Sequence, residues 1–206
     1  MNTPIESLLQ ARCYDPFGLL GLHREGTDWV IRVYEPHATE VDLLNKDGAA
    51  PLKRTHPCGV FEWRGNNEPS LPYRLRLHYG SATHEAYDPY QFPPHLSQQD
   101  LYLFGEGKLR QGYRMLGSHA VEINGVKGVR FAVWAPNAER VSVVGEFNNW
   151  DGRLHPMRSH GSSGVWELFL PEIKQHALYR YEIRNRATGQ ILTKTDPYAQ
   201  GYELRP

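Results

Sequence analysis

Short runs in which hydrophobic and polar residues alternate recur along most of the chain. WVIRVYEP at 29–36 and VRFAVWAP at 129–136 are two examples. A two-residue period places successive side chains on opposite faces of a strand. Both runs end at a proline, Pro36 or Pro136, which cannot donate to a central β-ladder. Because Gly, Pro and Asn interrupt such runs at close intervals, the pattern predicts an all-β fold of antiparallel β-sandwiches.

The first residues, MNTPIESLLQARC, have a different pattern and predict a short helix. Thr3 is suited to the N-cap, Pro4 to the first helical position, and Glu6 completes the spacing of a capping box. Ile5, Leu8 and Leu9 then form one apolar face. No basic segment followed by an apolar run begins the chain, and no run approaches the ~18 apolar residues of a membrane span. We therefore expect neither a secretory signal nor a membrane anchor.

The chain repeats one series of motifs. LGLH at 20–23 returns as LGSH at 116–119, and DPY at 88–90 returns as DPY at 196–198. The offset grows from 96 residues at the first match to 108 at the last, as expected of two related modules that differ by small loop insertions. Three further pairs of segments keep the same order: 32–44 with 132–144, 59–63 with 164–168, and 73–77 with 179–183.

These repeats predict two tandem immunoglobulin-like β-sandwiches, at 14–92 and 113–200, after an N-terminal helix at 1–13. Residues 93–112 would form a partly helical connector. Ser97 is placed to cap a brief helix there, which Gly105 and Gly107 would end.

Composition narrows the kinds of partner. Among 206 residues, Lys plus Arg and Asp plus Glu both number 23, so charge gives no reason to expect nucleic acid or an anionic membrane. The ten histidines are scattered, none with Cys or carboxylates at a metal-ligand spacing, so we expect no metal and no cofactor. Cys13 and Cys58 are too few for a disulfide framework, and we interpret them as free thiols in a reducing cytoplasm.

The ordered motifs DPFGLLGLH, VWAPNAERVSVVGEFNNWDG, WELFLP, YRYEI and TDPYA resemble the amino-terminal part of bacterial glycogen branching enzymes. The second module resembles a carbohydrate-binding module of family 48, whose signature is the GEFNNW loop followed by a YRY strand. The first resembles the extra β-sandwich found ahead of it in many of these enzymes.

The resemblance implies a parent enzyme of the α-amylase superfamily. That enzyme would cleave an α-1,4-glucan by a retaining mechanism and rejoin it through an α-1,6 bond, with its catalytic residues on a (β/α)₈ barrel. A barrel needs about 250 residues, so we expect no catalytic residue in this chain. Residues 201–206 are interpreted as the start of the link to the absent barrel, and the chain as a fragment.

The resemblance also indicates a glucan site on the loop GEFNNWDG at 145–152. A sugar ring offers an apolar face of C–H groups and a belt of hydroxyls, which a flat indole and planar amides complement. Trp150 would be the stacking platform, Asn149 a nearby amide and Asn148 a further contact, with Phe147 turned inward. Arg180 would stand beside the ring where relatives carry a lysine, since Tyr179 and Tyr181 share the other face of its strand.

Other interpretations remain open. Trp150 would also suit a hydrophobic cap on its sandwich or a contact with the barrel, and Arg180 a solvated strand position. No aromatic residue lies between Tyr181 and Tyr198, where glycogen-binding relatives usually carry a second tryptophan. One platform with a few hydroxyl contacts gives ~4 kcal/mol, or about millimolar affinity. The alternative function is a scaffold that docks the catalytic barrel or a second subunit without binding sugar.

The first module lacks these site residues. Its corresponding segment, LLNKDGAA at 43–50, predicts only a tight turn. Trp29 and Trp63 are expected in the core, and the module as a spacer that shapes which glucan chains reach the active site. His23 and His119 follow LG in both modules, which favours a structural role in a turn.

Two carboxylates flank the loop of the second module. Glu146 and Asp151 have the spacing of a catalytic pair, but their turn-like, solvated setting favours hydroxyl binding or solubility.

Overall fold

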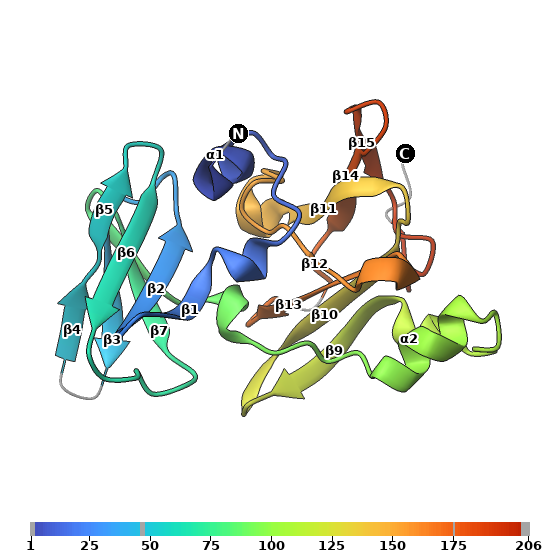
Figure 1. Ribbon diagram of the computed structural model, residues 1–206, viewed down its shortest axis with the longest axis horizontal. Helices are drawn as coiled ribbons and strands as arrows, with labels where there is room; N and C mark the ends of the chain where they lie inside the picture. Colours follow the sequence, from blue (N-terminus) through green and yellow to red (C-terminus); the bar gives the residue numbers. More distant parts are fainter. Residues whose placement is uncertain (1–2, 46–47, 175, 203–206) are drawn as a thin grey trace. The chain divides into compact units, whose positions relative to one another are not determined.

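The computed structural model describes residues 3–45, 48–174 and 176–202 and is built mainly of β-strands (Figure 1). The chain divides into two compact units. The first unit comprises residues 16–93 and 124–126, and the second comprises 1–15, 94–123 and 127–206. Each unit contains two antiparallel sheets, which confirms the all-β fold.

The first unit buries a core between its two sheets. Alternate residues of the strands face inward, and Ile31, Leu43, Phe61 and Leu75 are almost fully buried there. The first sheet has the order β1 (Gly21–Glu25), β2 (Asp28–Tyr34), β6 (Val60–Gly65), β5 (Lys53–His56); the second has the order β4 (Gly48–Pro51), β3 (Glu40–Asn45), β7 (Arg74–Tyr79), β8 (Ala82–Tyr87).

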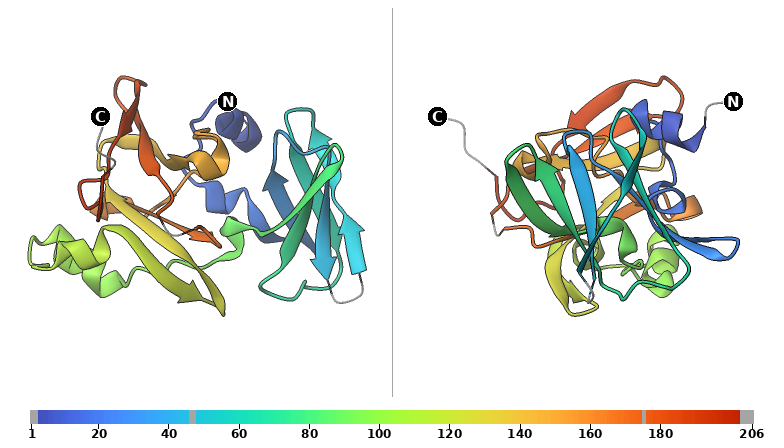
Figure 2. Two further views of the ribbon diagram at one scale, coloured as in Figure 1. Left: turned by 180° about the vertical axis from the view of Figure 1, so that it is seen from behind. Right: turned by 90° about the vertical axis from the view of Figure 1, so that its left-hand side faces the viewer.

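The second unit repeats this arrangement with one strand fewer among its described residues. Val141, Val143 and Tyr181 are fully buried. One sheet has the order β12 (Arg158–Ser159), β13 (Val165–Pro171), β10 (Val126–Trp134), β9 (Gly117–Ile123); the other has the order β11 (Ala138–Gly145), β14 (Tyr179–Asn185), β15 (Ile191–Lys194), the last two forming the hairpin drawn in red in Figure 2.

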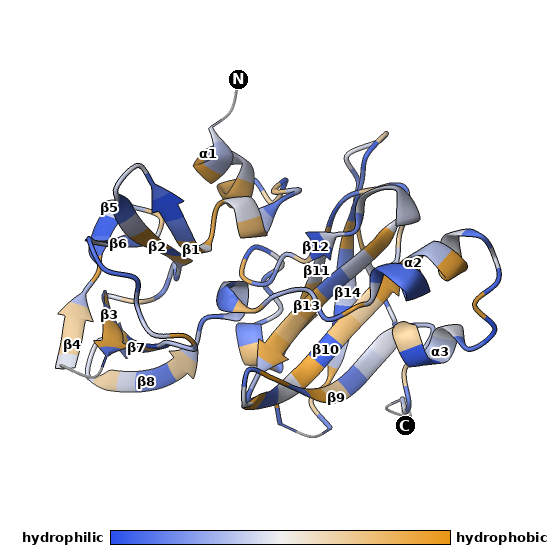
Figure 3. Ribbon diagram, turned by 60° about the horizontal axis from the view of Figure 1, so that its bottom comes forward, coloured by the Kyte–Doolittle hydropathy of each residue, from blue (hydrophilic) through white to orange (hydrophobic). Residues whose placement is uncertain are grey.

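Helices occur where the capping residues predict them. In α1 (Pro4–Leu9), the Thr3 side chain accepts from the amide of Glu6 and the Glu6 carboxylate accepts from the amide of Thr3, which confirms the capping box. In α2 (Gln98–Gly105), Ser97 accepts from the amide of Asp100. Helix α2 shares a buried cluster with Ala132 of β10 and Val165 of β13, two strands with many hydrophobic residues (Figure 3); the short helix α3 (Gly112–Met115) follows.

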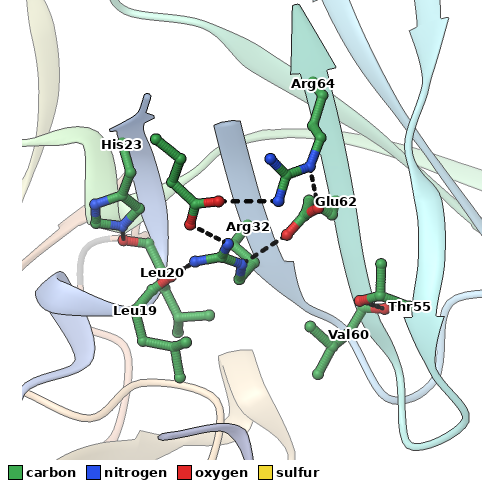
Figure 4. Close-up of polar contacts among 9 residues, drawn as sticks. Leu19, Leu20, His23, Arg32, Thr55, Val60, Glu62 and Arg64 are labelled. Atoms are coloured by element: carbon green, nitrogen blue, oxygen red, sulfur yellow. Dashed lines mark hydrogen bonds and ion pairs between the residues drawn. The ribbon is translucent and has the colours of Figure 1, made fainter. Parts of the chain in front are cut away.

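The repeated LG motifs form the same turn in both units. The Nε2 atom of His23 lies 2.9 Å from the carbonyl oxygen of Leu20, and that of His119 lies 2.9 Å from the carbonyl oxygen of Leu116. Figure 4 shows the first of these contacts. Each histidine thus bonds to the backbone of its own turn, which confirms the predicted structural role.

The DPY motifs are equivalent as well. Tyr73 donates its hydroxyl to Asp88 at 2.5 Å, and Tyr179 donates to Asp196 at 2.6 Å. Both aspartates are almost fully buried. Burial raises the pKa of Asp88 to about 6, which the hydroxyl of Tyr73 and the amide of Tyr90 partly oppose. The motif therefore joins the end of each unit, through a buried carboxylate, to a tyrosine just before β7 or at the start of β14.

An ion network lies on β1, β2 and β6 of the first unit (Figure 4). Arg32 pairs with Glu62 and Glu25, and Arg64 pairs with the same two carboxylates. The hydrogen bonds from Arg32 and Arg64 lower the pKa of Glu25. Because much of the network is exposed, its contribution to stability is small.

The two tryptophans of the first unit are half-buried. Trp63 packs against the central core, as predicted, and its ring lies over Gly65. Trp29 is less enclosed than predicted, and the guanidinium of Arg24 lies 5.6 Å from the centre of its ring.

Candidate functional site

The segment between β11 and β12 is much longer in the second unit than the segment between β3 and β4 in the first. In the second unit it begins with a 3₁₀ turn at Glu146–Asn148 and extends to residue 157; we call residues 146–157 the glucan loop, after the glucan site that the sequence predicts there. In the first unit, β3 and β4 pair directly, with Asn45 opposite Gly48. The intervening residues 46–47 of the predicted tight turn lie outside the described residues. A two-residue connection has no room for such a loop.

The backbone of the glucan loop holds two consecutive residues in the left-handed region. The φ angle of Asn149 is 52° and that of Trp150 is 60°. The amide of Trp150 donates to the carbonyl of Gly145 at 2.9 Å, and that of Asn149 to the carbonyl of Glu146 at 3.3 Å. Such a conformation is uncommon for a bulky residue and costs energy. It leaves the Trp150 side chain 43% exposed.

Asn148 has a structural role within the loop. Its side chain is 3% exposed, and its Oδ1 accepts from the amide of Gly145 at 2.9 Å. Its Nδ2 donates to the carbonyl of Val143 at 2.9 Å and lies 2.8 Å from Nδ1 of His155. This placement argues against the predicted sugar contact, because the amide is buried and both Oδ1 and Nδ2 already have protein partners.

Phe147 and His155 close the underside of the loop. The two rings are 5.8 Å apart, and a Cβ atom on Gly145 would lie 2.5 Å from the Phe147 ring. Phe147 thus packs over Gly145, as predicted for an inward anchor. Burial lowers the pKa of His155 to about 4, so the ring is neutral at pH 7 and its Nδ1 accepts from Asn148.

A buried arginine fixes the far side of the loop. Arg140 Nη1 and the hydroxyl of Ser142 donate to the carbonyl of Gly152 at 2.5 Å and 2.6 Å. The other nitrogen of Arg140 pairs with Glu182 on β14. A Cβ atom on Gly152 would lie only 2.0 Å from Glu182 Oε1. The loop is therefore held against the outer face of β11 and β14.

Sequence reasoning missed Arg140, Gly152, His155 and Glu182. One signal was available for Arg140, because a cationic side chain in the otherwise apolar run RVSVV needs a buried partner.

Arg180 lies on the same outer face as Glu182. It pairs with Val144 in the register of β11 and β14, one residue before Gly145. Arg180 is exposed, whereas Tyr181 is fully buried and Tyr179 half-buried, so the predicted division of the strand between core and surface is confirmed. Three of the four predicted site residues, Trp150, Asn149 and Arg180, are thus exposed near one end of β11.

The two carboxylates that flank the loop do not form a pair. Glu146 is exposed, while Asp151 is bound by Arg153, with Nη2 2.6 Å from Oδ2 and the Arg153 amide 2.9 Å from Oδ1. Asp151 therefore stabilises the loop through a local turn.

Two family models match the chain. Residues 1–90 match the N-terminal domain of alpha-1,4-glucan branching enzyme GlgB, and residues 115–199 match carbohydrate-binding module 48 (isoamylase N-terminal domain). The two parts of the chain belong to these families. The chain thus corresponds to the amino-terminal region of a bacterial 1,4-alpha-glucan branching enzyme.

Two relatives of high sequence identity are branching enzymes. The chain is 57% identical to the 1,4-alpha-glucan branching enzyme GlgB of Nitrosospira multiformis and 54% identical to that of Methylobacillus flagellatus. Each alignment covers 98% of this chain and 28% of the relative. The chain therefore spans somewhat more than a quarter of the length of these relatives.

Solved structures overlap only weakly with this chain. A pullulanase from Anoxybacillus sp. LM18-11, complexed with maltotetraose, aligns with a TM-score of 0.35 at 16% identity, over 88% of this chain and 24% of that one. None of the described helices has the length and apolar character that crossing a membrane requires.

Proposed function

We propose that this chain is the non-catalytic part of a glycogen branching enzyme that binds and positions α-1,4-glucan chains for α-1,6 branch formation. The glucan loop is the binding element. Trp150 supplies the stacking surface, and Asn149 and Arg180 supply hydrogen bonds to hydroxyls. The parent enzyme's barrel, in this proposal, carries the catalytic residues.

One observation supports the proposal most strongly. Trp150 has a positive φ angle and a 43% exposed side chain, on a loop held by Asn148, Phe147 and Arg140. Strain of this kind persists where the surrounding structure imposes it, and it is concentrated at binding sites. A loop needed only for folding would gain more from burying its tryptophan.

The chemistry of the exposed groups suits a neutral polymer. An indole covers the apolar face of a glucose unit, an amide both donates and accepts, and a guanidinium donates to several oxygens. A single platform gives about millimolar affinity per site. Useful binding then depends on avidity along a chain that offers many equivalent sites.

Retardation in a native gel containing glycogen tests the proposal. The wild-type chain should be retarded, with maltoheptaose as competitor, and Trp150→Ala should migrate as it does in a gel without polysaccharide. Trp134→Ala is the matched control, because Trp134 is 55% exposed in the same unit but lies beyond the opposite end of β11. Equal migration of wild type and Trp150→Ala, with and without glycogen, would refute direct binding by this loop.

A second candidate function is docking of the catalytic barrel or of a second subunit. It is favoured by the exposure of Trp134, whose ring lies 6.2 Å from Phe104, at a distance from the glucan loop. It expects Trp134→Ala to destabilise the full-length enzyme while glycogen retardation stays unchanged. The first unit has no loop of this kind, and in both versions we assign it the role of a spacer.

We further propose a cytoplasmic location. Cys13 and Cys58 are both free thiols, which suits a reducing compartment.

A further inference from the structure

The first residues of the chain pack on the second unit, although the whole first unit separates the two in sequence. We infer that residues 3–15, here called the N-terminal arm, are a positioning element of the glucan loop. The arm would hold the β11–β14 surface on which the loop rests without touching sugar itself. The expected effect on glucan binding rests on the proposed function, whereas the hydrogen-exchange test of the arm does not.

Two polar or aromatic side chains attach the arm. Arg12 lies 2.9 Å from Glu139 Oε1. The hydroxyl of Tyr14 lies 2.9 Å from that of Ser159 on β12, and its ring meets Trp166 of β13 edge to face, 5.5 Å between centres. The arm therefore contacts both sheets of the second unit.

Apolar burial adds to these contacts. Leu8 of α1 is 1% exposed and Cys13 is 6% exposed. Burial raises the pKa of the Cys13 thiol to about 11, and Arg140 is close enough to oppose this shift. The charge of the arginine that holds the glucan loop therefore acts on the end of the arm.

Glu139 connects the arm to Arg184, which lies opposite that arginine. It is the residue at an irregularity in the β11–β14 register, between Ala138 and Arg140. Its second oxygen accepts from Arg184 Nε at 2.7 Å, and Arg184 lies directly opposite Arg140. Glu139 therefore stands beside two arginines that face each other across the strands. Such like charges repel, and Glu139, itself paired with Arg12, neutralises Arg184, the strand neighbour of Arg140.

The side chain of Arg140 connects the surface held by the arm to the glucan loop. Arg140 is 1% exposed and bonds to the carbonyl of Gly152. A displaced Arg140 would leave the Gly152 carbonyl with the Ser142 hydroxyl alone of its two donors, and would loosen the segment that carries Trp150. The family model of the first domain covers residues 1–90, so it assigns the arm to the other half of the chain.

Hydrogen exchange on the 206-residue chain tests this inference without any ligand. The variant Arg12→Ala/Tyr14→Ala should increase exchange about tenfold at amides that tie the loop down: Val143 to His155, Trp150 to Gly145, and Met157 to Val141. Arg24→Ala, which removes an exposed arginine of the first unit, is the control and should leave these amides unchanged. Unchanged protection of residues 143–157 in the double variant would overturn the inference.

Arg12→Ala alone guards against a variant that fails to fold. Its side chain is 47% exposed, so the chain should fold and the loop should exchange faster by a smaller factor. If neither variant alters the loop, the arm has no positioning role.

Glycogen retardation of the same variants separates the two proposals. If loop exchange rises and retardation weakens by about threefold, both stand. If loop exchange rises while wild type itself is not retarded, the arm positions the loop but the proposed function is wrong.

Discussion

The amide of Trp150 donates to the carbonyl of Gly145 at 2.9 Å, and this bond closes the turn that carries the indole. Asn149 lies inside the turn with a φ angle of 52°. The left-handed conformation is open to glycine without cost, is tolerated by asparagine and penalises alanine by about 1 kcal/mol. The backbone conformation at position 149 therefore favours asparagine or glycine, whether or not the side chain contacts sugar.

Substitutions of Asn149 separate its backbone role from a sugar contact. Asn149→Gly should keep the stability of wild type within about 0.5 kcal/mol and weaken glucan affinity about twofold to threefold, because only the amide is lost. Asn149→Ala should destabilise the unit and weaken affinity further. Urea denaturation and affinity electrophoresis measure both effects. Equal stability of the two variants would contradict the role of the turn.

Gly152 is expected to be sensitive to any side chain. A Cβ atom there would lie 2.0 Å from Glu182 Oε1 and 2.8 Å from Arg140 Nη1. Gly152→Ala should destabilise the second unit by about 1–3 kcal/mol and weaken retardation by glycogen. Gly105→Ala is the control, since a Cβ atom on Gly105 meets no atom within 4 Å. If both alanine variants are as stable as wild type, the loop does not rest on Arg140 and Glu182 as described.

The stability of the loop should depend on pH through His155. Its pKa is lowered from 6.5 to about 4, so the unfolded chain takes up a proton before the native one does. The contribution of His155 to the free energy of unfolding is therefore complete above pH 6.5. It is lost as pH falls toward 4, by up to ~3 kcal/mol. His155→Gln keeps an acceptor for Asn148 but does not titrate.

Comparison of wild type with His155→Gln isolates this effect. The difference in unfolding free energy between the two should shift with pH between 6.5 and 4, since the acids whose pKa is raised, Glu35 and Asp88, are common to both. A constant difference over this range would show that His155 is free to take up a proton in the folded chain.

The two DPY motifs predict unequal effects of the same substitution. Tyr73→Phe should cost about 1–3 kcal/mol, because the carboxylate of Asp88 keeps only the amide of Tyr90 among its described donors. Tyr179→Phe should cost less, because Tyr181 also donates to Asp196, at 3.2 Å. Chemical denaturation of each variant measures the difference. A larger loss for Tyr179→Phe would contradict this account of the repeat.

The sequence predicted those features of the fold that depend on residues close together in the chain. The capping box at Thr3 and Glu6, the cap at Ser97 and the alternating strands follow from short-range hydrogen bonds and side-chain period. The repeat predicted matching turns at His23 and His119, since each bonds within its own motif.

The sequence could not predict which side chains of the glucan loop are buried and which are exposed. Asn148 and Asn149 are chemically identical neighbours, and only the backbone conformation decides that the first is buried and the second exposed. The N-terminal arm was equally unpredictable, because Arg12 and Glu139 are ordinary surface charges until the fold joins them across 127 positions. Contacts of this kind leave no periodic signal.

The indole N–H signals of the five tryptophans give the most direct test of the central claim. In a ¹⁵N–¹H spectrum titrated with maltoheptaose, the signal assigned to Trp150 by its Trp150→Phe variant should shift progressively and saturate in the millimolar range, while that of Trp134 stays in place. A Trp150 signal that does not move at saturating maltoheptaose would contradict glucan stacking on this loop.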